Sequence, residues 1–248
     1  MLLLQCFLVA LVHGVGTMDG KFFGMTLFQE PLVLSFVTGL VLGDVQTGLV
    51  MGAQLQLIFM GFVGIGYSSL PNAITGSVLA VAFCIMSSIN TESAIALAMP
   101  IALLFQPTKT LNRIANDILI APADKAAENG DEKGIARVFW IGTLISFLIA
   151  FVPAFVAIYF GADAVSALIN VIPKVVMDGL NKAGTILPAL GIALLMNYIV
   201  EKSTLPFIFL GFILAAFLGM NTLSIAALAC VIALVFYNMN TQKNKGGA

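Results

Sequence analysis

Apolar segments follow one another along almost the whole chain, and most are shorter than the roughly 20 residues that a straight transmembrane helix needs. Glycine, proline or polar residues separate them. The segments are Met1–Val15, Pro31–Leu42, Leu49–Ile65, Ala73–Ile89, Ser93–Phe105, Val138–Phe160, Ala164–Leu180, Thr185–Val200, Leu205–Leu218 and Leu223–Met239. Interrupted helices are tolerated at membrane depth only where they line a cavity or pack on protein. The pattern therefore predicts an all-α polytopic membrane protein with multiple short, broken and re-entrant helices.

The composition agrees with this class and excludes several others. Hydrophobic residues make up 60% of the chain and charged residues 9%, whereas soluble domains carry about 25% charged residues. The formal net charge of −1 gives no sign of a nucleic-acid-binding surface. The three cysteines and the single histidine lack metal-ligand spacing, so we expect no metal and no other cofactor.

Polar segments suggest how the chain is organised. We expect one membrane domain over residues 1–248, with a polar connecting segment at 109–137 and a polar tail at 241–248. The connecting segment holds five of the eleven basic residues, which favours the cytoplasmic side. Within it, Ala121–Gly134 predicts a short surface helix followed by a turn.

A similar pattern occurs at two places in the chain. Leu42-Gly43 ends an apolar run that starts near Pro31, and Leu218-Gly219 ends one that starts near Pro206. Two related halves, as many transporters have, would produce this pattern. Coincidence in a chain rich in leucine and glycine explains it equally well.

Polar side chains interrupt the apolar sequence between Leu40 and Asn72. They are Asp44, Gln46, Gln54, Gln56 and Asn72, among glycines at 39, 43, 48, 52, 61, 64 and 66. Lipid cannot hydrogen-bond an amide or a carboxylate, so these groups must face protein, water or a ligand. Amides match sugar hydroxyls, which both donate and accept hydrogen bonds. The stretch therefore predicts a site for a polar solute, and hence transport.

Five residues are candidates to bind that solute. Gln56 is the strongest, and Gln54, two residues earlier on a helix, points to a different face. For either glutamine, hydrogen bonding between helices is an equal alternative. Asn72 is a ligand or a helix cap, and Asp44 is better explained as the cap of the next helix. Glu30, before a proline at a membrane boundary, completes the set.

Two basic residues follow a proline break at the start of the polar connecting segment. Lys109 and Arg113 are candidates to attract a phosphorylated partner, because cations favour an approaching phosphate. Loop solubility and membrane orientation explain them as well.

The polar stretch also carries a recognisable motif. It consists of Gly43-Asp44, Thr47-Gly48, Gly52, Gln56-Leu57-Ile58, Gly61, Gly66 and Pro71-Asn72. In these residues the chain resembles the IIC membrane subunit of the mannose–fructose–sorbose family of the bacterial phosphoenolpyruvate-dependent sugar phosphotransferase system (PTS). Further matches at Ala98-Met99-Pro100, Ala123–Ala127 and Ile172-Pro173 extend the resemblance over nearly the whole chain.

The resemblance implies a function and a set of partners. It implies a membrane permease subunit that binds a hexose or amino sugar and translocates it inward for phosphorylation by IIB. The implied partners are the membrane subunit IID, cytoplasmic IIA and IIB proteins or domains, and the lipid bilayer, in a higher oligomer. The implied location is the bacterial cytoplasmic (inner) membrane. The family's phosphohistidines lie on IIA and IIB, so this chain would contribute sugar binding and translocation with no catalytic residue of its own.

Two other classes of function remain open from the residues alone. An ion-coupled secondary sugar transporter would share the broken helices and would keep a buried carboxylate, such as Asp44 or Glu30, for its coupling ion. A purely structural membrane scaffold would explain the hydrophobicity, but it leaves the amides and glycines of the polar stretch without a role.

Overall fold

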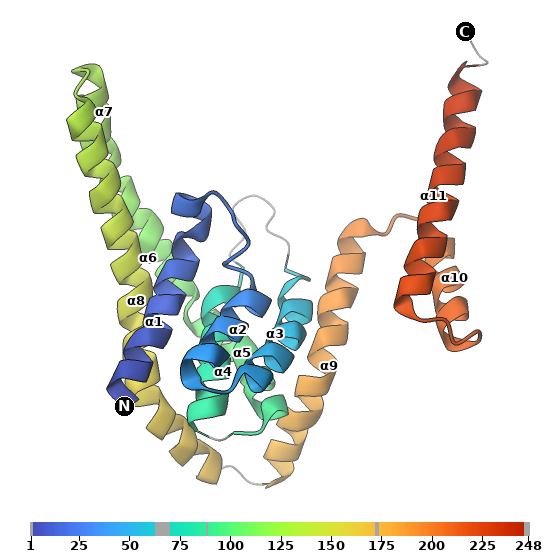
Figure 1. Cartoon of the computed structure of the whole chain (residues 1–248), viewed down its shortest axis with the longest axis horizontal. Helices are drawn as coiled ribbons and strands as arrows, with labels where there is room; N and C mark the ends of the chain where they lie inside the picture. The colour runs from blue at the N-terminus through green and yellow to red at the C-terminus, as the bar shows by residue number, and fades with distance from the viewer. Residues whose placement is uncertain (1, 63–69, 88, 172–173, 246–248) are drawn as a thin grey trace. The chain divides into compact units, whose positions relative to one another are not determined.

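The computed structural model describes residues 2–62, 70–87, 89–171 and 174–245, and the regular structure in these ranges is helical (Figure 1). The helices are α1 Leu2–Met18, the π-helical turn η1 Asp19–Phe23, α2 Pro31–Leu42, α3 Val45–Phe59, α4 Ala73–Met86, α5 Thr91–Leu104, α6 Gln106–Asp117, α7 Ile120–Glu128, α8 Glu132–Val171, α9 Lys174–Ile199, α10 Leu205–Ala216 and α11 Thr222–Lys245. The predicted all-α class is confirmed.

Several helical segments are long and apolar enough to cross a membrane. Within the described residues there are four, Leu3–Phe23, Thr91–Glu128, Glu132–Gly161 and Thr222–Met239. Shorter apolar helices of 10–17 residues lie between them, including α2 and α3. The combination of full-length and short helices is the one that the sequence predicts for a polytopic membrane protein.

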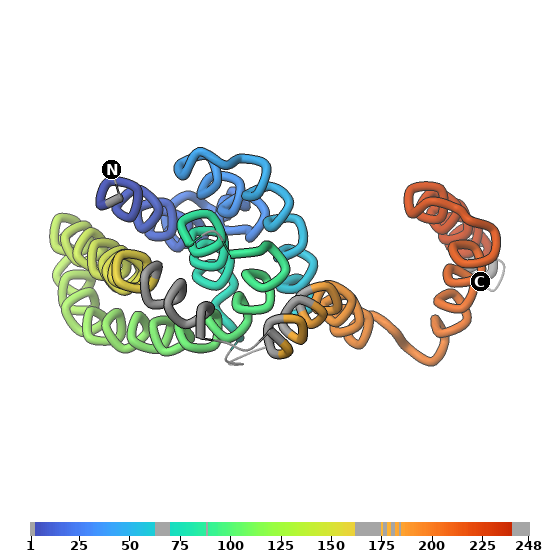
Figure 2. The backbone as a smooth tube through the Cα atoms, turned by 90° about the horizontal axis from the view of Figure 1, so that it is seen from below, coloured from blue at the N-terminus to red at the C-terminus, as the bar shows by residue number. Residues whose placement is uncertain are grey.

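The chain forms two compact units, Met1–Met196 and Asn197–Ala248. In the first unit, α4 lies among α1, α2, α3, α5 and α8 (Figures 1 and 2). Residues Thr75–Cys84 of α4 are buried without interruption, as expected of a helix that is apolar on all sides. Around it the core contains Leu34, Met51, Leu55 and Ile158.

Helices α2 and α3 form a tight antiparallel hairpin. Gly43 has φ +87°, a conformation that glycine adopts at no steric cost, and it ends α2. A Cβ atom added to Gly39 would lie 2.9 Å from the Cα of Gly48 and 2.6 Å from the backbone oxygen of Asp44. The two backbones therefore touch, which explains why the sequence has glycine at both positions.

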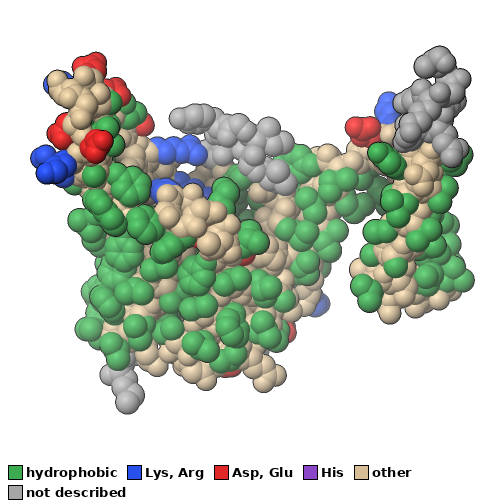
Figure 3. Space-filling model, turned by 45° about the horizontal axis from the view of Figure 1, so that its top comes forward, with side chains coloured by type: hydrophobic (Ala, Val, Ile, Leu, Met, Phe, Trp, Pro, Cys, Tyr) green, Lys and Arg blue, Asp and Glu red, His purple; other side chains and the backbone are tan. Residues whose placement is uncertain are grey.

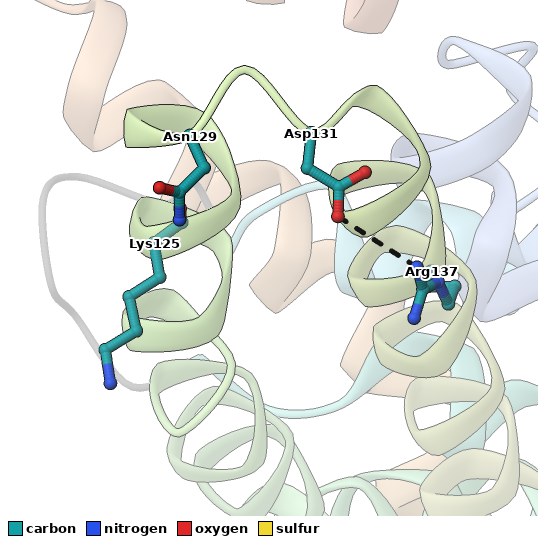
Figure 4. Close-up of polar contacts among 4 residues, drawn as sticks. All are labelled: Lys125, Asn129, Asp131 and Arg137. Carbon is teal, nitrogen blue, oxygen red and sulfur yellow. Dashed lines mark hydrogen bonds and ion pairs between the residues drawn. The ribbon is translucent and has the colours of Figure 1, made fainter.

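An exposed arm, Ile120–Arg137, consists of α7 and the first turns of α8. Gly130, with φ +65°, makes the turn between the two helices. The Nδ2 of Asn129 donates to the backbone oxygen of Lys125 at 2.7 Å, and Arg137 lies 4.0 Å from the Asp131 carboxylate (Figure 4). The helix and turn predicted for Ala121–Gly134 are confirmed.

Two segment boundaries differ from the sequence prediction. Helix α8 is 40 residues long, so the apolar segment Val138–Phe160 continues into the polar connecting segment without a break. Helix α9 runs through residues 181–184, where we expected a gap between two segments. The intervening sequence, NKAG, contains no proline, and a single glycine costs a helix only about 1 kcal/mol.

The second unit contains an antiparallel pair of apolar helices. Helices α10 and α11 pack against each other, with the rings of Phe207 and Phe236 5.9 Å apart. The backbone N–H of Ser224 donates to the Asn221 side chain at 2.8 Å, which caps the start of α11. The predicted polar tail at 241–248 coincides with the end of α11 and with three residues outside the described ranges.

Candidate functional site

A polar cavity of about 260 Å³ lies within the first unit. Five elements contribute its walls: the end of α1, η1, the start of α4, α6 and α8. The lining residues are His13, Thr17, Lys21, Asn72, Ile74, Thr108, Lys109, Asn112, Arg113, Ile149 and Ala150. Pockets for drug-sized ligands occupy about 300–1,000 Å³, so this cavity suits a small solute.

The buried end of the polar cavity lies between α1 and α4. His13 is 2% exposed and shares a 2.8 Å hydrogen bond through Nε2 with the hydroxyl of Thr75. Its second ring nitrogen, Nδ1, is buried and has no hydrogen-bond partner among the described residues. A buried imidazole held on one side in this way presents a polar edge within the wall.

Asn72 forms part of the cavity wall and also starts α4. Its side-chain oxygen accepts from the backbone N–H of Thr75 at 3.4 Å, and its own N–H donates to the oxygen of Ala102 at 2.9 Å. The side chain is 4% exposed. The capping role predicted for Asn72 is confirmed, and the residue also lines the cavity, but its contact with a solute stays a prediction.

A network of amides, a hydroxyl and a lysine meets the cavity at Lys21 and Asn112. Lys21 donates to the Asn112 side-chain oxygen at 3.1 Å and to the Ser146 hydroxyl at 3.4 Å. Ser146 donates to the same Asn112 oxygen at 3.0 Å, and Asn116 donates to Ser146 at 3.2 Å. We call these four residues the amide network. It joins η1, α6 and α8 at a single point.

The cavity is lined by cations and neutral groups. Lys21, Lys109 and Arg113 belong to its lining, and the described lining includes no carboxylate. Lys109 and Arg113 are four residues apart on α6 and so share one face of that helix. On the face shown in Figure 3, Lys and Arg side chains gather in a recess beside the arm. The electrostatic character of this site is therefore positive.

The strongest candidate from the sequence, Gln56, lies elsewhere and is paired with Glu30. Its Nε2 donates to the Glu30 carboxylate at 2.7 Å, and its Oε1 accepts from the backbone N–H of Leu32 at 3.2 Å. The structure thus brings together two of the five predicted residues, where the start of α2 meets the last turns of α3, at the end of the hairpin away from the Gly43–Asp44 turn. Neither residue lines the polar cavity.

Asp44 and Gln54 occupy further positions in the α2–α3 hairpin. The Asp44 carboxylate accepts from the Thr47 backbone N–H at 3.0 Å and from the Thr47 hydroxyl at 2.6 Å, so the predicted capping role is confirmed. Gln54 is half-buried on α3 and does not line the cavity. Their contact with a sugar stays a prediction, and glycines 64 and 66 lie outside the described residues.

The connection that leads into Glu30 is organised by a buried carboxylate. Asp19 accepts hydrogen bonds from the backbone N–H and hydroxyl of Thr26 and, at 3.4 Å, from the N–H of Gln29. Met25 and Leu27 in this connection have φ of 61° and 67°, which non-glycine residues rarely adopt. The hydrogen bonds to Asp19 compensate for that conformation and fix the position of the chain before α2.

Sequence reasoning missed most of the cavity. Lys21 and Asn112 are 91 residues apart, and Lys21 and Ser146 are 125 residues apart, so no local pattern links them. The available signal was the polar side of α6, where charged and amide residues follow a proline break. Among the described residues, no three His, Cys, Asp or Glu side chains come together as metal ligands would.

Comparisons with known proteins agree over nearly the full length. The family model described as "PTS system sorbose-specific iic component" matches residues 3–235. The "PTS system mannose-specific EIIC component" of Escherichia coli (strain K12) is 32% identical over 243 residues, covering 96% of this chain and 89% of that protein. The "Fructose permease IIC component" of Bacillus subtilis (strain 168) is 28% identical over 241 residues, covering 97% of this chain and 88% of that protein.

Solved structures resemble the fold as well. A chain described as "Structure of membrane protein" has a TM-score of 0.86 and 29% sequence identity, covering 97% of this chain and 98% of its own. A chain from "CryoEM Structure of Mannose Transporter ManYZ and Microcin E492 (MceA) complex" has a TM-score of 0.60 and 29% identity, with 95% of each chain covered. Fold and sequence therefore point to the same group of membrane transporters.

Proposed function

Because the chain belongs to the family of sorbose-specific IIC components of the PTS, we propose that its polar cavity is where it binds the sugar that it transports. The chain is a membrane permease subunit of such a system, and PTS IIC components work with other PTS subunits. The proposal adds the site and the route: a hexose or amino sugar enters the cavity and passes inward for phosphorylation by a IIB partner.

The chemistry of the cavity carries this proposal. Amide groups of Asn72 and Asn112 and hydroxyl groups of Thr17 and Thr108 line one volume of about 260 Å³. Amides and hydroxyls offer both donors and acceptors, as a molecule with many hydroxyl groups requires. The apolar Ile149 on the same wall would contact the carbon face of a sugar ring. Orientation by a few polar groups within a confined volume is the usual construction of a small-molecule site.

The Glu30–Gln56 pair is the second part of the proposal. Its two side chains lie between the start of α2 and the last turns of α3, beside a connection that Asp19 holds in place. A sugar hydroxyl exchanging with one of these hydrogen bonds would bind there without leaving a buried charge unsatisfied. Gln56 and Glu30 therefore remain proposed ligands, together with Gln54 and Asp44 as weaker members of the set.

Partners and location also belong to the proposal. We expect a IID membrane subunit, cytoplasmic IIA and IIB proteins or domains, a higher oligomer, and the bacterial inner membrane. Both helices of the second unit expose large apolar side chains such as Phe209, Phe212 and Leu234, a surface suited to lipid or to another membrane subunit. A single domain over residues 1–248, with the polar segments at 109–137 and 241–248, is the corresponding domain organisation.

The alternative of ion-coupled transport receives less support from the comparisons, because the matching family model and the similar proteins are components of phosphotransferase systems. The carboxylates that it would use, Asp44 and Glu30, accept hydrogen bonds from Thr47 and Gln56. An ion, like a sugar, would have to exchange with these bonds.

Uptake of a panel of radiolabelled sugars tests the proposal. Cells expressing the chain with its PTS partners would be given mannose, fructose, sorbose and N-acetylgalactosamine. We expect Asn112→Ala to reduce uptake of the transported sugar by about tenfold, the equivalent of one or two lost hydrogen bonds. Asn129→Ala on the arm is the matched control, because Asn129 bonds only locally to Lys125 (Figure 4).

Two control measurements distinguish a loss of sugar binding from a loss of folded or assembled protein. Membrane abundance and copurification with the IID subunit should be the same for both asparagine variants. Full uptake by a correctly assembled Asn112→Ala protein would contradict the placement of the sugar in this cavity. Uptake that continues without the phosphotransferase proteins and depends on a proton or sodium gradient would favour the ion-coupled alternative.

A further inference from the structure

We propose that the cationic side of the polar cavity binds a phosphate group, so that the chain holds the phosphorylated sugar as well as the free one. This inference rests on the proposed function, because it places the phosphate next to the proposed sugar site. The ligand class is a phosphate monoester whose other part is small enough for a cavity of about 260 Å³.

Three cations from two separate elements line the same cavity. Lys21 comes from η1, while Lys109 and Arg113 come from adjacent turns of α6. The hydrogen bonds of the two lysines go to neutral acceptors: Asn112 and Ser146 for Lys21, and the backbone oxygen of Pro71, at 3.5 Å, for Lys109. All three side chains are exposed, so water screens part of their mutual repulsion, and an anionic ligand would reduce the remainder.

The acidic residue nearest to Lys21 along the chain is directed to other partners. Asp19, in the same η1 turn, accepts hydrogen bonds from Thr26 and Gln29. The described lining of the cavity includes no carboxylate, and the described hydrogen bonds of Lys21 and Lys109 go to neutral groups. The charges of these two lysines are therefore available to a ligand, and Arg and Lys are the side chains that bind phosphate oxygens most strongly.

The neutral groups of the cavity would bind the rest of such a ligand. Asn112 links the two sides, because its side-chain oxygen accepts from Lys21 and the residue also lies between Lys109 and Arg113 on α6. Asn72 and Thr17 lie in the same lining. A phosphorylated sugar would thus place its phosphate against the cations and its hydroxyls against the amides.

The position of the cations along the chain agrees with this assignment. Helix α6 begins the polar segment 109–137, which the distribution of basic residues predicts to be cytoplasmic. A phosphorylating partner would approach from that side. Long-range attraction of the approaching phosphate and retention of the phosphorylated sugar would then use the same three side chains.

Binding measurements on the intact complex test this inference. The chain would be purified with its membrane partner in nanodiscs of phosphatidylcholine, and the probes would be inorganic phosphate, mannose and mannose 6-phosphate. We expect mannose 6-phosphate to bind about tenfold or more tightly than mannose, as charge-assisted hydrogen bonds of about 1.5–3 kcal/mol would give. Inorganic phosphate should compete with the phosphorylated sugar, and added salt should weaken the competition.

Variants that remove positive charge test whether Lys109 and Arg113 cause the preference for mannose 6-phosphate. The double change Lys109→Gln and Arg113→Gln should reduce the preference for mannose 6-phosphate over mannose by about tenfold. Lys109→Arg, which keeps the charge, should preserve the preference, and so should the control Lys125→Gln on the arm. If the double variant is unstable in size-exclusion chromatography, the single change Lys109→Gln and the salt dependence of the unaltered complex give the same information.

Each outcome decides between specific alternatives. Equal binding of mannose and mannose 6-phosphate by the unaltered complex would overturn the inference, and so would a preference that survives the double change. If the basic residues instead retain phosphatidylglycerol from mixed nanodiscs and ignore the sugar phosphate, the site is a lipid headgroup site. Sugar binding that is lost in Asn112→Ala but shows no phosphate preference leaves the proposed function intact and removes only this inference.

Discussion

The Glu30–Gln56 pair makes a prediction that the structure allows to be worked through in detail. Gln56→Ala removes two hydrogen bonds, one to a carboxylate at 2.7 Å and one from the Leu32 N–H at 3.2 Å. A hydrogen bond to a charged group contributes about 1.5–3 kcal/mol and a neutral one about 0.5–1.5 kcal/mol. Gln56 is only half-buried, so solvent screening lowers the expected loss to about 1–3 kcal/mol.

Thermal unfolding in detergent measures this loss. For a chain of this length, 1 kcal/mol shifts the Tm by about 2–4 °C, so we expect Gln56→Ala to lower the Tm by roughly 2–12 °C. Glu30→Gln keeps an oxygen that accepts from Gln56 and should cost less. Gln54→Ala, the same change two residues away on α3, is the matched control and should lower the Tm least.

A double-mutant cycle shows whether the two side chains act as a pair. In the background of Glu30→Ala, the further change Gln56→Ala should cost about 1 kcal/mol less than it does alone, because the charged partner is already absent. Fully additive effects would refute the reasoning that the 2.7 Å bond contributes to stability.

Uptake by the same variants separates binding from stability. We expect Gln56→Ala to abolish sugar uptake while copurification with the IID partner persists. If uptake falls in Gln56→Ala but not in another α2–α3 variant of equal Tm, Gln56 contacts the sugar. Normal uptake by Gln56→Ala in cells with all partners would leave the glutamine with a structural role only.

Three further predictions concern the backbone of the first unit. Asp44→Ala should lower stability by about 1 kcal/mol through loss of the α3 cap, whereas Asp44→Asn should retain most of the wild-type stability. The Tm in detergent should therefore be higher for Asp44→Asn than for Asp44→Ala, and the reverse order would contradict the capping role. Gly48→Ala should force α2 and α3 apart, because the added Cβ would lie 2.7 Å from the Ser35 backbone oxygen. We expect less folded protein on expression, and a Tm equal to that of the wild type would argue against contact between the two backbones. Gly191→Ala should have a comparable effect, since its added Cβ would overlap the Leu57 backbone oxygen on α3, and normal assembly would exclude that close approach.

Local patterns in the sequence determine some features of this structure reliably. Gly43 followed by Asp44 predicts a helix end and a helix start, and both residues act as expected, because a left-handed glycine and a capping carboxylate need only neighbouring atoms. Asn72 similarly caps α4. Apolar segment length predicts α2 with its observed bounds, Pro31–Leu42.

The candidate site depended on contacts that no local pattern specifies. His13 is a single histidine in an apolar run, and only the packing of α1 on α4 gives it Thr75 as a partner. Lys21 meets Asn112 because η1 and α6 both pack near α8. The sequence singles out Gln56 as a sugar ligand or a hydrogen-bonding residue between helices, but its partner, Glu30, emerges only from the geometry of the α2–α3 hairpin.

The length of α8 has a mechanical consequence. A helix of 40 residues extends about 60 Å, roughly twice the thickness of the hydrocarbon core, so this helix cannot lie wholly within the bilayer unless it is strongly tilted. From Glu132 at the arm to Ser146 in the amide network is about 21 Å along the same rod. A force on the arm, such as a bound partner would exert, therefore tilts α8, which the 3.0 Å hydrogen bond from Ser146 to Asn112 holds against α6. Because Ile149 and Ala150 of α8 line the cavity, a tilt of this helix would change the shape of the cavity without any change in the residues that line it.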